Sequence, residues 1–212
     1  MFGLMGLNGV GKTTMIKSIL GLRDPDLGQI DILGTDRLSL SSKRQLAYLP
    51  ERFDPPWFLS GIEFIKFSLK LYRAPFVKSE VEAAAIQLAL DPAVLRNRVQ
   101  TYSKGMRQKL GLLATLLTGC PLLILDEPMS GLDPRARAHV KDMLRAVKAQ
   151  GRTVFLSSHI LSDMSELCDR VVVLHDCRFR YEGTPADLCR YGQSENIERA
   201  FLNVIDGRCA AA

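Results

Sequence analysis

The stretch MFGLMGLNGVGKTT (residues 1–14) decides the fold class of this chain. Residues 6–13 fit the pattern G-x-x-x-x-G-K-[S/T], whose glycines let backbone N–H groups curl around phosphate oxygens. The apolar segment FGLM leads into this loop, and helix-forming residues follow it as far as Gly21, a helix stop signal. The stretch therefore predicts a phosphate-binding loop between a strand and a helix.

The residues of this loop have distinct tasks. Lys12 is expected to reach the β- and γ-phosphates of a nucleotide, and Thr13 to offer its hydroxyl to Mg²⁺. The helix that follows points its positive end at the same anion. The predicted nucleotide contacts of this segment are Asn8, Gly9, Val10, Gly11, Lys12, Thr13 and Thr14.

Apolar segments and turn signals along the rest of the chain alternate as strand, helix, strand. This order predicts an α/β fold, a nucleoside-triphosphatase core with a mostly parallel sheet. A helix should begin at Asp133 and Pro134, with an apolar stripe that ends at Val147. The further predicted strands are 30–33, 46–49, 121–125, 153–158 and 170–174.

We expect a single domain over residues 1–212. Its core comprises residues 1–50 and 119–192, and a weakly patterned tail covers 193–212. Between the two core segments, residues 51–118 form an inserted helical subdomain, whose first part is rich in aromatic residues and holds the only Trp.

Asp126 and Glu127 follow the apolar segment LLIL at the carboxyl end of a predicted strand, where α/β sheets place their ligands. Adjacent carboxylates on a buried strand are costly unless a cation or a proton accompanies them. Asp126 is therefore a candidate magnesium ligand, directly or through water. Glu127 is the candidate that orients or deprotonates an attacking water.

Two further residues have both a structural and a functional interpretation. His159 ends the strand TVFLSS at the edge that carries Glu127, so its imidazole could bind a γ-phosphate or could be an ordinary hydrogen-bonded histidine. Ser103, in TYSKGMRQKL, is a good N-cap, and the helix N-terminus that it begins could also face a phosphate.

Composition excludes several classes of protein. The chain has 212 residues, of which 47% are hydrophobic and 24% charged, which argues against disorder. Its five cysteines include no C-x-x-C pair, so disulfide scaffolding and a zinc site are not expected. The longest apolar segment is broken by Gly119 and Pro121, so we expect a chain that reaches a membrane only through a partner. The formal net charge of +5 keeps a role on nucleic acid open.

Together these motifs resemble the ATP-binding subunit of an ABC transporter, over about Phe2 to Leu188. GLNGVGKTT is similar to that family's Walker A loop, LLILDEP to its Walker B strand, SGLD (130–133) to its D-loop, and His159 to its switch histidine. The resemblance implies that two subunits enclose two Mg²⁺–ATP in a homodimer. In it, Ser103, Gly105 and Asp133 would contribute to the nucleotide sites, Ser103 and Gly105 at the γ-phosphate held by the other subunit.

The resemblance also implies a partner and a location. The aromatic lobe after Pro50 would dock an integral-membrane permease, which gives Trp57, Phe58 and Phe64 a role as partner surface or leaves them as core. The subunit would then be cytoplasmic, on the inner face of the cell membrane, and would hydrolyse ATP without binding nucleic acid. The signature variant YSKGM resembles that of exporters with a separate permease.

Three departures from the family pattern stand out. The signature LSGGQ is replaced by residues 102–106, and the Q-loop glutamine by Glu51, whose carboxylate could still reach Mg²⁺. The strands and adenine-stacking aromatic that usually precede the phosphate loop are missing. Met1 is therefore interpreted as a possible internal methionine, and the adenine end of the site as open. Two alternatives stay open: a nucleotide-switched clamp on nucleic acid or ribosomes, and an inactive truncated fragment.

Overall fold

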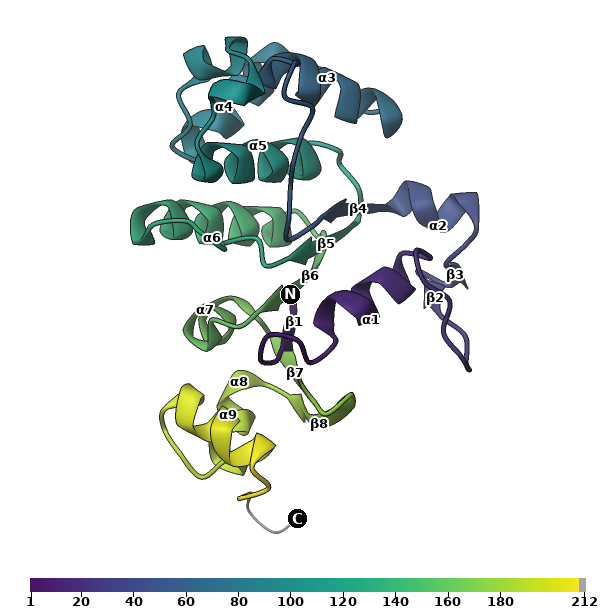
Figure 1. Cartoon of the computed structure of the whole chain (residues 1–212), viewed down its shortest axis with the longest axis vertical. Coiled ribbons are helices and arrows are strands. Elements are labelled where there is room, and N and C mark those ends of the chain that lie inside the picture. Colours follow the sequence, from purple (N-terminus) through teal and green to yellow (C-terminus); the bar gives the residue numbers. More distant parts are fainter. Residues whose placement is uncertain (210–212) are drawn as a thin grey trace. The chain divides into compact units, whose positions relative to one another are not determined.

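The computed structural model describes residues 1–209, and its chain forms two compact units (Figure 1). Unit 1 comprises Met1–Ser42 and the described part of Thr153–Ala212. Unit 2 is Lys43–Arg152. This division follows contacts within the chain, and the subdomain boundaries 51–118 stay a prediction.

A parallel sheet organises unit 1. Its central strand β1 (Phe2–Met5) pairs in parallel with β6 (Thr153–Ser158) on one side and with β7 (Arg170–His175) on the other. Strand β8 (Arg178–Gly183) pairs antiparallel with β7 and closes that side of the unit. Three of the four β1 residues are buried, as expected for a parallel strand covered on both faces.

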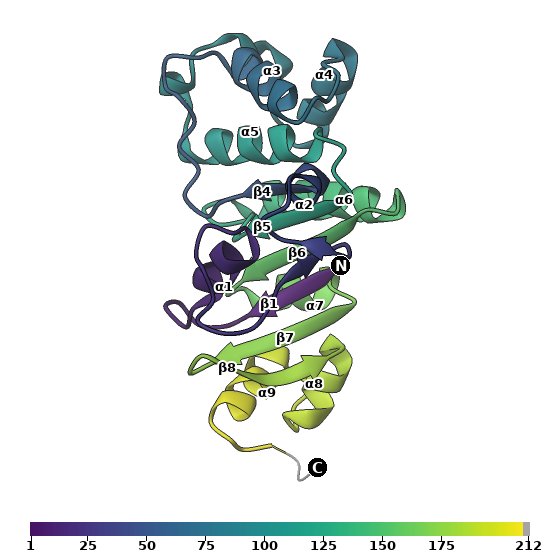
Figure 2. The same ribbon diagram turned by 90° about the vertical axis from the view of Figure 1, so that its right-hand side faces the viewer.

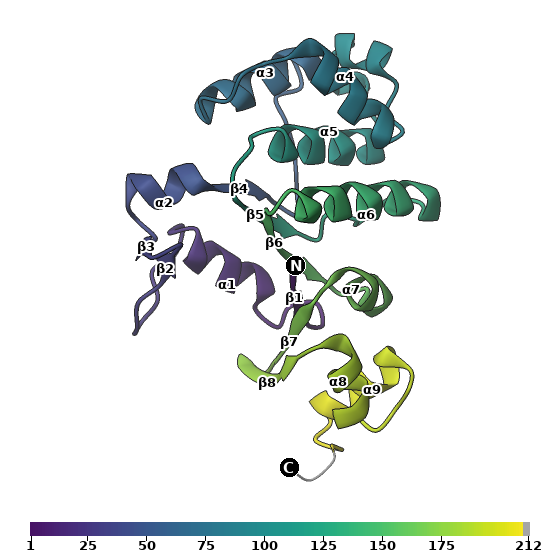
Figure 3. The ribbon, with the colours of Figure 1, turned by 180° about the vertical axis from the view of Figure 1, so that it is seen from behind.

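Helices cover both faces of this sheet. Figure 3 shows α1 (Lys12–Ile19) and α7 (Leu161–Leu167) on opposite sides of β1 and β7. Helix α7 contacts both β1 and β6. The remaining elements of unit 1 are a two-strand hairpin, β2 (Asp31–Ile32) and β3 (Thr35–Asp36), and two helices that pack on each other, α8 (Pro185–Tyr191) and α9 (Ile197–Ile205).

Unit 2 contains a parallel strand pair and a helical layer. Strand β4 (Leu46–Leu49) pairs with β5 (Leu122–Asp126), and α6 (Pro134–Ala149) follows β5. In Figure 2, α5 (Lys104–Leu116) lies between β4 and the outer helices α3 (Gly61–Leu71) and α4 (Lys78–Gln87). Short helices η1 (Pro92–Arg96) and η2 (Val99–Thr101) connect α4 to α5, and α2 (Leu40–Gln45) runs across the boundary between the two units.

Local sequence signals explain where the unit 2 helices begin. Ser60 Oγ accepts a hydrogen bond from Glu63 N at 3.3 Å, and Glu63 Oε2 accepts one from Ser60 N at 2.8 Å, so a capping box starts α3. Asp133 caps α6 as predicted. The predicted stripe of α6 is buried in full: Ala136, Val140, Met143, Leu144 and Val147.

Most predicted strands are confirmed at the predicted residues. β4 and β6 match, and β5 is shifted by one residue. The structure adds β8, α8 and α9, which the sequence did not predict. Within residues 1–209, no helix combines the length and apolarity needed to cross a membrane. The five cysteines are free thiols in this structure.

Candidate nucleotide-binding site

The loop after β1 has the backbone of an anion cradle. Gly9 and Gly11 have φ values of 84° and 106°, which L residues with a side chain rarely adopt. A Cβ added at either glycine would have no heavy atom within 4 Å, so the space above the loop is open on this side. Phosphate oxygens can therefore approach the backbone closely here.

Lys12 and the start of α1 place positive charge at this loop. The Lys12 Nζ donates hydrogen bonds to Gly6 O at 2.8 Å and to Leu7 O at 3.3 Å, so the ammonium is held over the loop. Gly11 is the N-cap of α1 and provides no side-chain cap for the first N–H groups of the helix. These N–H groups and the helix dipole suit a bound anion, so the loop fits the triphosphate of a nucleotide.

Gly6 has a different role from the glycines that follow it. A Cβ on Gly6 would lie 2.7 Å from Val10 Cγ2 and 2.8 Å from Leu174 O, distances too short for a side chain. Close packing between the loop and the end of β7 therefore requires glycine at this position.

The sheet register brings His159 to the edge of the phosphate loop. Met5, the last residue of β1, pairs with Ser158, the last residue of β6. The residues that follow, Gly6 and His159, therefore leave the sheet at the same edge. His159 is exposed, and Ile160 N donates to Ser158 Oγ at 3.0 Å and fixes the turn after it. Unit 1 thus carries the phosphate loop and His159 together.

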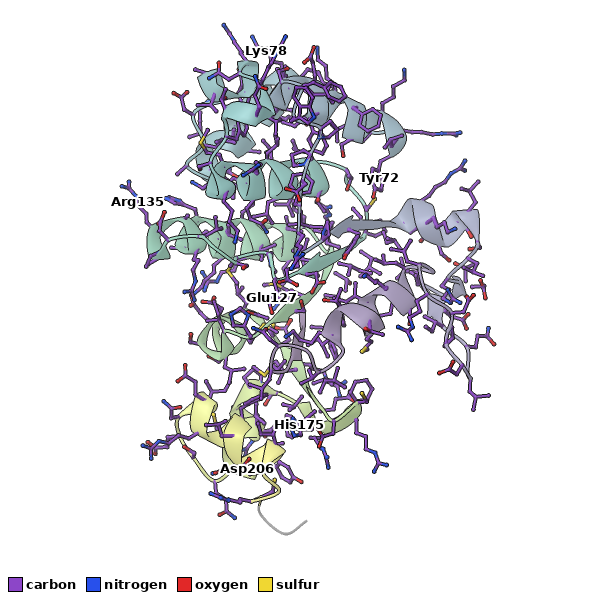
Figure 4. All side chains as sticks on the ribbon, in the orientation of Figure 1. Tyr72, Lys78, Glu127, Arg135, His175 and Asp206 are labelled. Carbon is purple, nitrogen blue, oxygen red and sulfur yellow. The ribbon has the colours of Figure 1, made fainter. Side chains whose placement is uncertain are left out.

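Unit 2 carries the two carboxylates at the carboxyl end of β5, Asp126 as its last residue and Glu127 directly after it. Asp126 is fully buried and Glu127 is 5% exposed, and Figure 4 shows Glu127 where the chain leaves β5. Glu127 has a φ of 50°, in the left-handed region. A glutamate in this conformation is strained by roughly 1–2 kcal/mol, and such strain concentrates at functional sites. Gln108 Nε2 supports the same turn, donating to Pro128 O at 3.0 Å.

Glu51 and Asp126 leave neighbouring strands of unit 2. Leu49 of β4 pairs with Leu125 of β5, so Pro50 and Asp126 follow at the same edge. Burial, then the nearby carboxylates of Asp126 and Glu51, raise the pKa of Tyr48 to about 12. The carboxylates of Glu51 and Asp126, both predicted magnesium ligands, therefore act on the same side chain.

The signature residues lie beside the D-loop of their own chain. Ser103 is the N-cap of α5, and its Oγ accepts from Met106 N at 3.2 Å, so the structural interpretation of Ser103 is confirmed. Lys104 packs over Gly131, since a Cβ there would lie 3.1 Å from Lys104 Cε. Glu51, Lys104 and Ser130 line one cavity of about 420 Å³, so the Q-loop position, the signature and the D-loop meet within unit 2.

Asp133 caps α6 at the end of the same loop. Its Oδ1 accepts a hydrogen bond from Ala136 N at 2.9 Å. This backbone hydrogen bond holds the pKa of the Asp133 carboxyl below its usual value. The Asp133 side chain is therefore an ordinary N-cap of α6.

The predicted metal ligands divide between the units, with Thr13 in unit 1 and Glu51 and Asp126 in unit 2. Across residues 1–209, no three or more His, Cys, Asp or Glu side chains gather as a metal-binding group. Magnesium in nucleotide sites needs only one or two carboxylates, because phosphates and water complete its shell. The residues present fit an ion that arrives with its nucleotide.

Two supporting residues of the site were missed in the sequence. Gln108 is buried in the mainly apolar face of α5, and Tyr48 is half-buried near the end of β4. A polar side chain inside an apolar helix stripe is a usable signal, and Gln108 offers it. Tyr48 offers none, because tyrosine is common in strands.

Comparison with known proteins agrees with this site. Residues 1–130 match the sequence profile of the ABC transporter family. The chain is 37% identical over 179 residues to an ABC transporter ATP-binding protein of Nostoc sp., covering 82% of this chain and 52% of that protein. It is 38% identical over 191 residues to the Nod factor export ATP-binding protein I of Rhizobium meliloti, covering 87% and 56%.

A shorter relative and a solved structure match over more of their length. The ABC transporter ATP-binding protein YxlF of Bacillus subtilis is 34% identical over 206 residues, covering 96% of this chain and 68% of that protein. An ATP-binding subunit of an ABC transporter superimposes with a TM-score of 0.88 at 32% identity, covering 96% of this chain and 87% of that structure. The chain spans little more than half the length of the first two relatives it matches, 52% and 56%. With its phosphate loop, its Walker B carboxylates and these relatives, the chain belongs to the ABC transporter family, among the ATP-binding subunits.

Proposed function

We propose that this chain hydrolyses ATP and powers the export of a substrate through a separate membrane permease. The conformation of the phosphate loop carries the proposal. Gly9 and Gly11 open the backbone toward solvent, and Lys12 holds its ammonium over the loop. A cradle of this kind supports nucleotide binding, which hydrolysis requires.

Each site residue has a task that its chemistry supports. Lys12 neutralises charge on the β- and γ-phosphates, and the loop N–H groups orient them. Mg²⁺ bound with ATP would be held by Thr13, Asp126 and Glu51. It would neutralise further charge on the phosphates. Glu127, with its carboxylate at the strand end, orients and deprotonates the attacking water. His159, exposed beside the loop, donates to the γ-phosphate.

Gly105 supports a two-subunit arrangement. A Cβ on Gly105 would meet only Leu132 Cδ2, at 3.6 Å, which is ordinary van der Waals contact. Packing within the chain therefore does not require glycine at this helical position. A nucleotide on a second copy, held against Ser103 and Gly105, would require it, which favours a homodimer that encloses two Mg²⁺–ATP.

Exposed aromatic side chains in unit 2 support a permease partner. Trp57 and Phe58 are 64% and 57% exposed and form an edge-to-face pair. Phe64, in contrast, is half-buried and packs edge-on against Phe53. Trp57 and Phe58 are the better candidates for a docking surface, on a subunit located at the cytoplasmic face of the membrane. The name of the Rhizobium meliloti relative supports export as the direction.

Steady-state phosphate release with Mg²⁺–ATP tests the catalytic part. Glu127→Gln should lower turnover by roughly 10²–10⁴-fold and preserve ATP binding, because only the base is removed. Lys12→Ala should lose ATP binding itself. His159→Ala should lower turnover, and His139→Ala, on α6, is the matched histidine control and should not. Wild-type turnover in Glu127→Gln would overturn the assignment of the base.

The permease part needs a separate measurement. The chain should co-purify with a permease expressed beside it, and Trp57→Ala with Phe58→Ala should weaken that complex without changing basal hydrolysis. Phe67→Ala, another exposed aromatic of unit 2, serves as the control. Full complex formation by the double variant would place the docking surface elsewhere.

A further inference from the structure

A buried hydrogen bond joins α5 to the turn that follows β5, within unit 2. Gln108 on α5 is 6% exposed, and its Nε2 donates to Pro128 O at 3.0 Å. Only the amide nitrogen of a glutamine side chain can donate to a carbonyl, so this contact fixes the orientation of the amide. Pro128 directly follows Glu127, the residue proposed to act on the attacking water. The hydrogen bond therefore holds the backbone one residue beyond the proposed base.

Packing alone does not require glutamine at position 108. The rest of the buried face of α5 is mainly apolar and includes Leu110, Leu112 and Leu113. Methionine has nearly the same length and would fill this space without burying an amide. A buried amide is tolerated where it has a partner, and the Pro128 carbonyl is that partner. The need for a donor at this position therefore comes from the turn after β5.

This turn needs support because the backbone of Glu127 is strained. Glu127 has a φ of 50°, although a residue before a proline favours extended conformations. Strained residues persist only where the surrounding structure fixes them. Pairing of β5 with β4 fixes the chain as far as Leu125, and the Gln108 hydrogen bond fixes the carbonyl of Pro128. Asp126 and Glu127 lie between these two anchor points.

The rest of the turn has further anchors, and α5 supplies one of them. Ser130 N donates to Glu127 O at 3.0 Å, which closes the turn. Lys104 packs over Gly131, as described above. Lys104 and Gln108 are four residues apart on α5, so they lie on the same face of the helix. The first half of α5 is therefore the support on which this turn rests.

We propose that Gln108 is a positioning residue for Glu127: its hydrogen bond to Pro128 O holds the strained backbone that directs the Glu127 carboxylate to the attacking water. The inference rests on the proposed function, because it concerns the base of the proposed hydrolysis. In this role Gln108 acts through Glu127 and not on the reacting atoms. A base displaced by about 1 Å can lose up to ~10²-fold in rate while the nucleotide stays bound.

Gln108→Met removes the donor and keeps the size of the side chain. Turnover of Mg²⁺–ATP should fall roughly five- to tenfold, as for the loss of one hydrogen bond, and ATP affinity measured by calorimetry should stay unchanged. Thr115→Val is the matched control, because it removes another buried hydrogen bond of α5, from Thr115 Oγ1 to Gly111 O at 2.8 Å. Thr115 lies about two helical turns beyond Gln108, so this control should keep wild-type turnover. Thermal melting shows whether each variant is folded.

A double-variant cycle separates positioning from a general structural role. In a Glu127→Gln background, Gln108→Met should lower the remaining turnover no further, because the group that Gln108 positions is already lost. A general structural defect would lower turnover by the same factor in both backgrounds, and that result would overturn the inference.

Gln108→Glu is a second variant that keeps the shape of the side chain. The neutral form of the new carboxyl group can donate to Pro128 O, whereas its anion cannot. Turnover relative to the wild type should therefore fall as the pH rises and this group ionises. A ratio that stays constant with pH would contradict the need for a donor.

Hydrogen exchange measures the support of the turn without hydrolysis. The Ser130 amide is bonded to Glu127 O, so its protection reports whether the turn keeps its conformation. Exchange of the peptide that contains Ser130 should accelerate several-fold in Gln108→Met and should not change in Thr115→Val. Unchanged exchange in Gln108→Met would show that Gln108 does not hold the turn.

The outcomes distinguish the two proposals. If the wild-type chain hydrolyses no ATP, Glu127 has no reaction to assist and both proposals fail. If the wild type hydrolyses ATP and Gln108→Met does so at the same rate, the proposed function stands and the positioning role is wrong. A loss of turnover that requires an intact Glu127, with ATP affinity unchanged, supports the inference.

Discussion

The N-termini of α1 and α6 are built in opposite ways. Helix α6 begins at Asp133, whose side chain accepts from Ala136 N and satisfies the first turn from within the chain. Helix α1 begins at Gly11, which offers its own first turn no side-chain cap. Helix α5 follows the pattern of α6, with Ser103 as its cap. Side chains of the protein thus cap the first N–H groups of α5 and α6. The N-terminus of α1, which has no side-chain cap, is suited to a bound anion.

This difference separates structural helix ends from ligand-binding ones. All three sequences contain residues that favour a helix start, so a cap by itself identifies no function. What distinguishes α1 is the positive φ of Gly9 and Gly11 and the open space beside both glycines. The predictions below change glycines and caps of these three helices.

The largest effect on phosphate binding is expected from Gly11→Ala. A Cβ at a φ of 106° is strained by roughly 1–2 kcal/mol, and the loop should open away from its anion-binding conformation. The free energy of unfolding should fall by about that amount, measured by urea denaturation. Tripolyphosphate affinity should fall at least about tenfold, as for a loss of 1.4 kcal/mol or more. Full affinity in this variant would show that the glycine conformation is not needed for phosphate binding.

Two glycines of α5 should respond in opposite directions. A Cβ on Gly111 would lie 2.7 Å from Leu49 Cδ1 and 2.8 Å from Phe53 Cδ1, so Gly111→Ala overpacks the core and should cost about 1–3 kcal/mol. A Cβ on Gly105 makes only an ordinary van der Waals contact, with Leu132 Cδ2 at 3.6 Å, so Gly105→Ala should stabilise the helix by up to ~1 kcal/mol. Urea denaturation of both variants measures the contrast.

The same Gly105→Ala variant tests the proposed dimer. It should be more stable than the wild type and yet hydrolyse ATP more slowly, because its methyl group would meet the nucleotide of the second subunit. A variant that gains stability and keeps full turnover would indicate that Gly105 faces solvent throughout the cycle. Thr115→Ser, a conservative change further along α5, is the control for general effects on the helix.

The smallest effect is expected at the cap of α6. Asp133→Ala should lower the Tm by roughly 2–4 °C, the effect of one lost cap in a chain of this size. Asp133→Asn should retain the cap, because its amide oxygen can accept from the same N–H group.

The pH dependence of this cap follows from the direction of the Asp133 pKa. The folded state lowers that pKa, so the carboxylate contributes stability above its ordinary pKa of about 4, and the contribution is lost as the pH falls through the folded value. The difference in Tm between the wild type and Asp133→Asn should therefore shift below about pH 4 and stay constant above it. A constant difference down to pH 2 would contradict the role of the charge.

Local and periodic signals in the sequence determined a large part of this protein. The loop at residues 6–13, the strands at 46–49 and 153–158 and the buried stripe of α6 were all predicted, because each depends on spacing within one short segment. The structure confirms the two strands and the buried stripe of α6. In the loop, Gly9 and Gly11 have the positive φ values expected of a phosphate-binding backbone. In the structure, the parallel strands β1 and β6 end at a common edge of the sheet, so His159 lies at the edge from which the phosphate loop leaves.

Other properties depend on contacts between distant segments, so only the tertiary structure decided them. Gly105 and Gly111 are equivalent in the sequence of one helix, but Leu49 and Phe53 fill the space beside only one of them. The left-handed backbone of Glu127 has no sequence signal, because nothing local favours it over an ordinary strand end. Strand β8 was not predicted because it exists only through pairing with β7. That pairing places Phe179 beside the phosphate loop, some 165 residues from it in the sequence, a proximity that long-range packing alone creates.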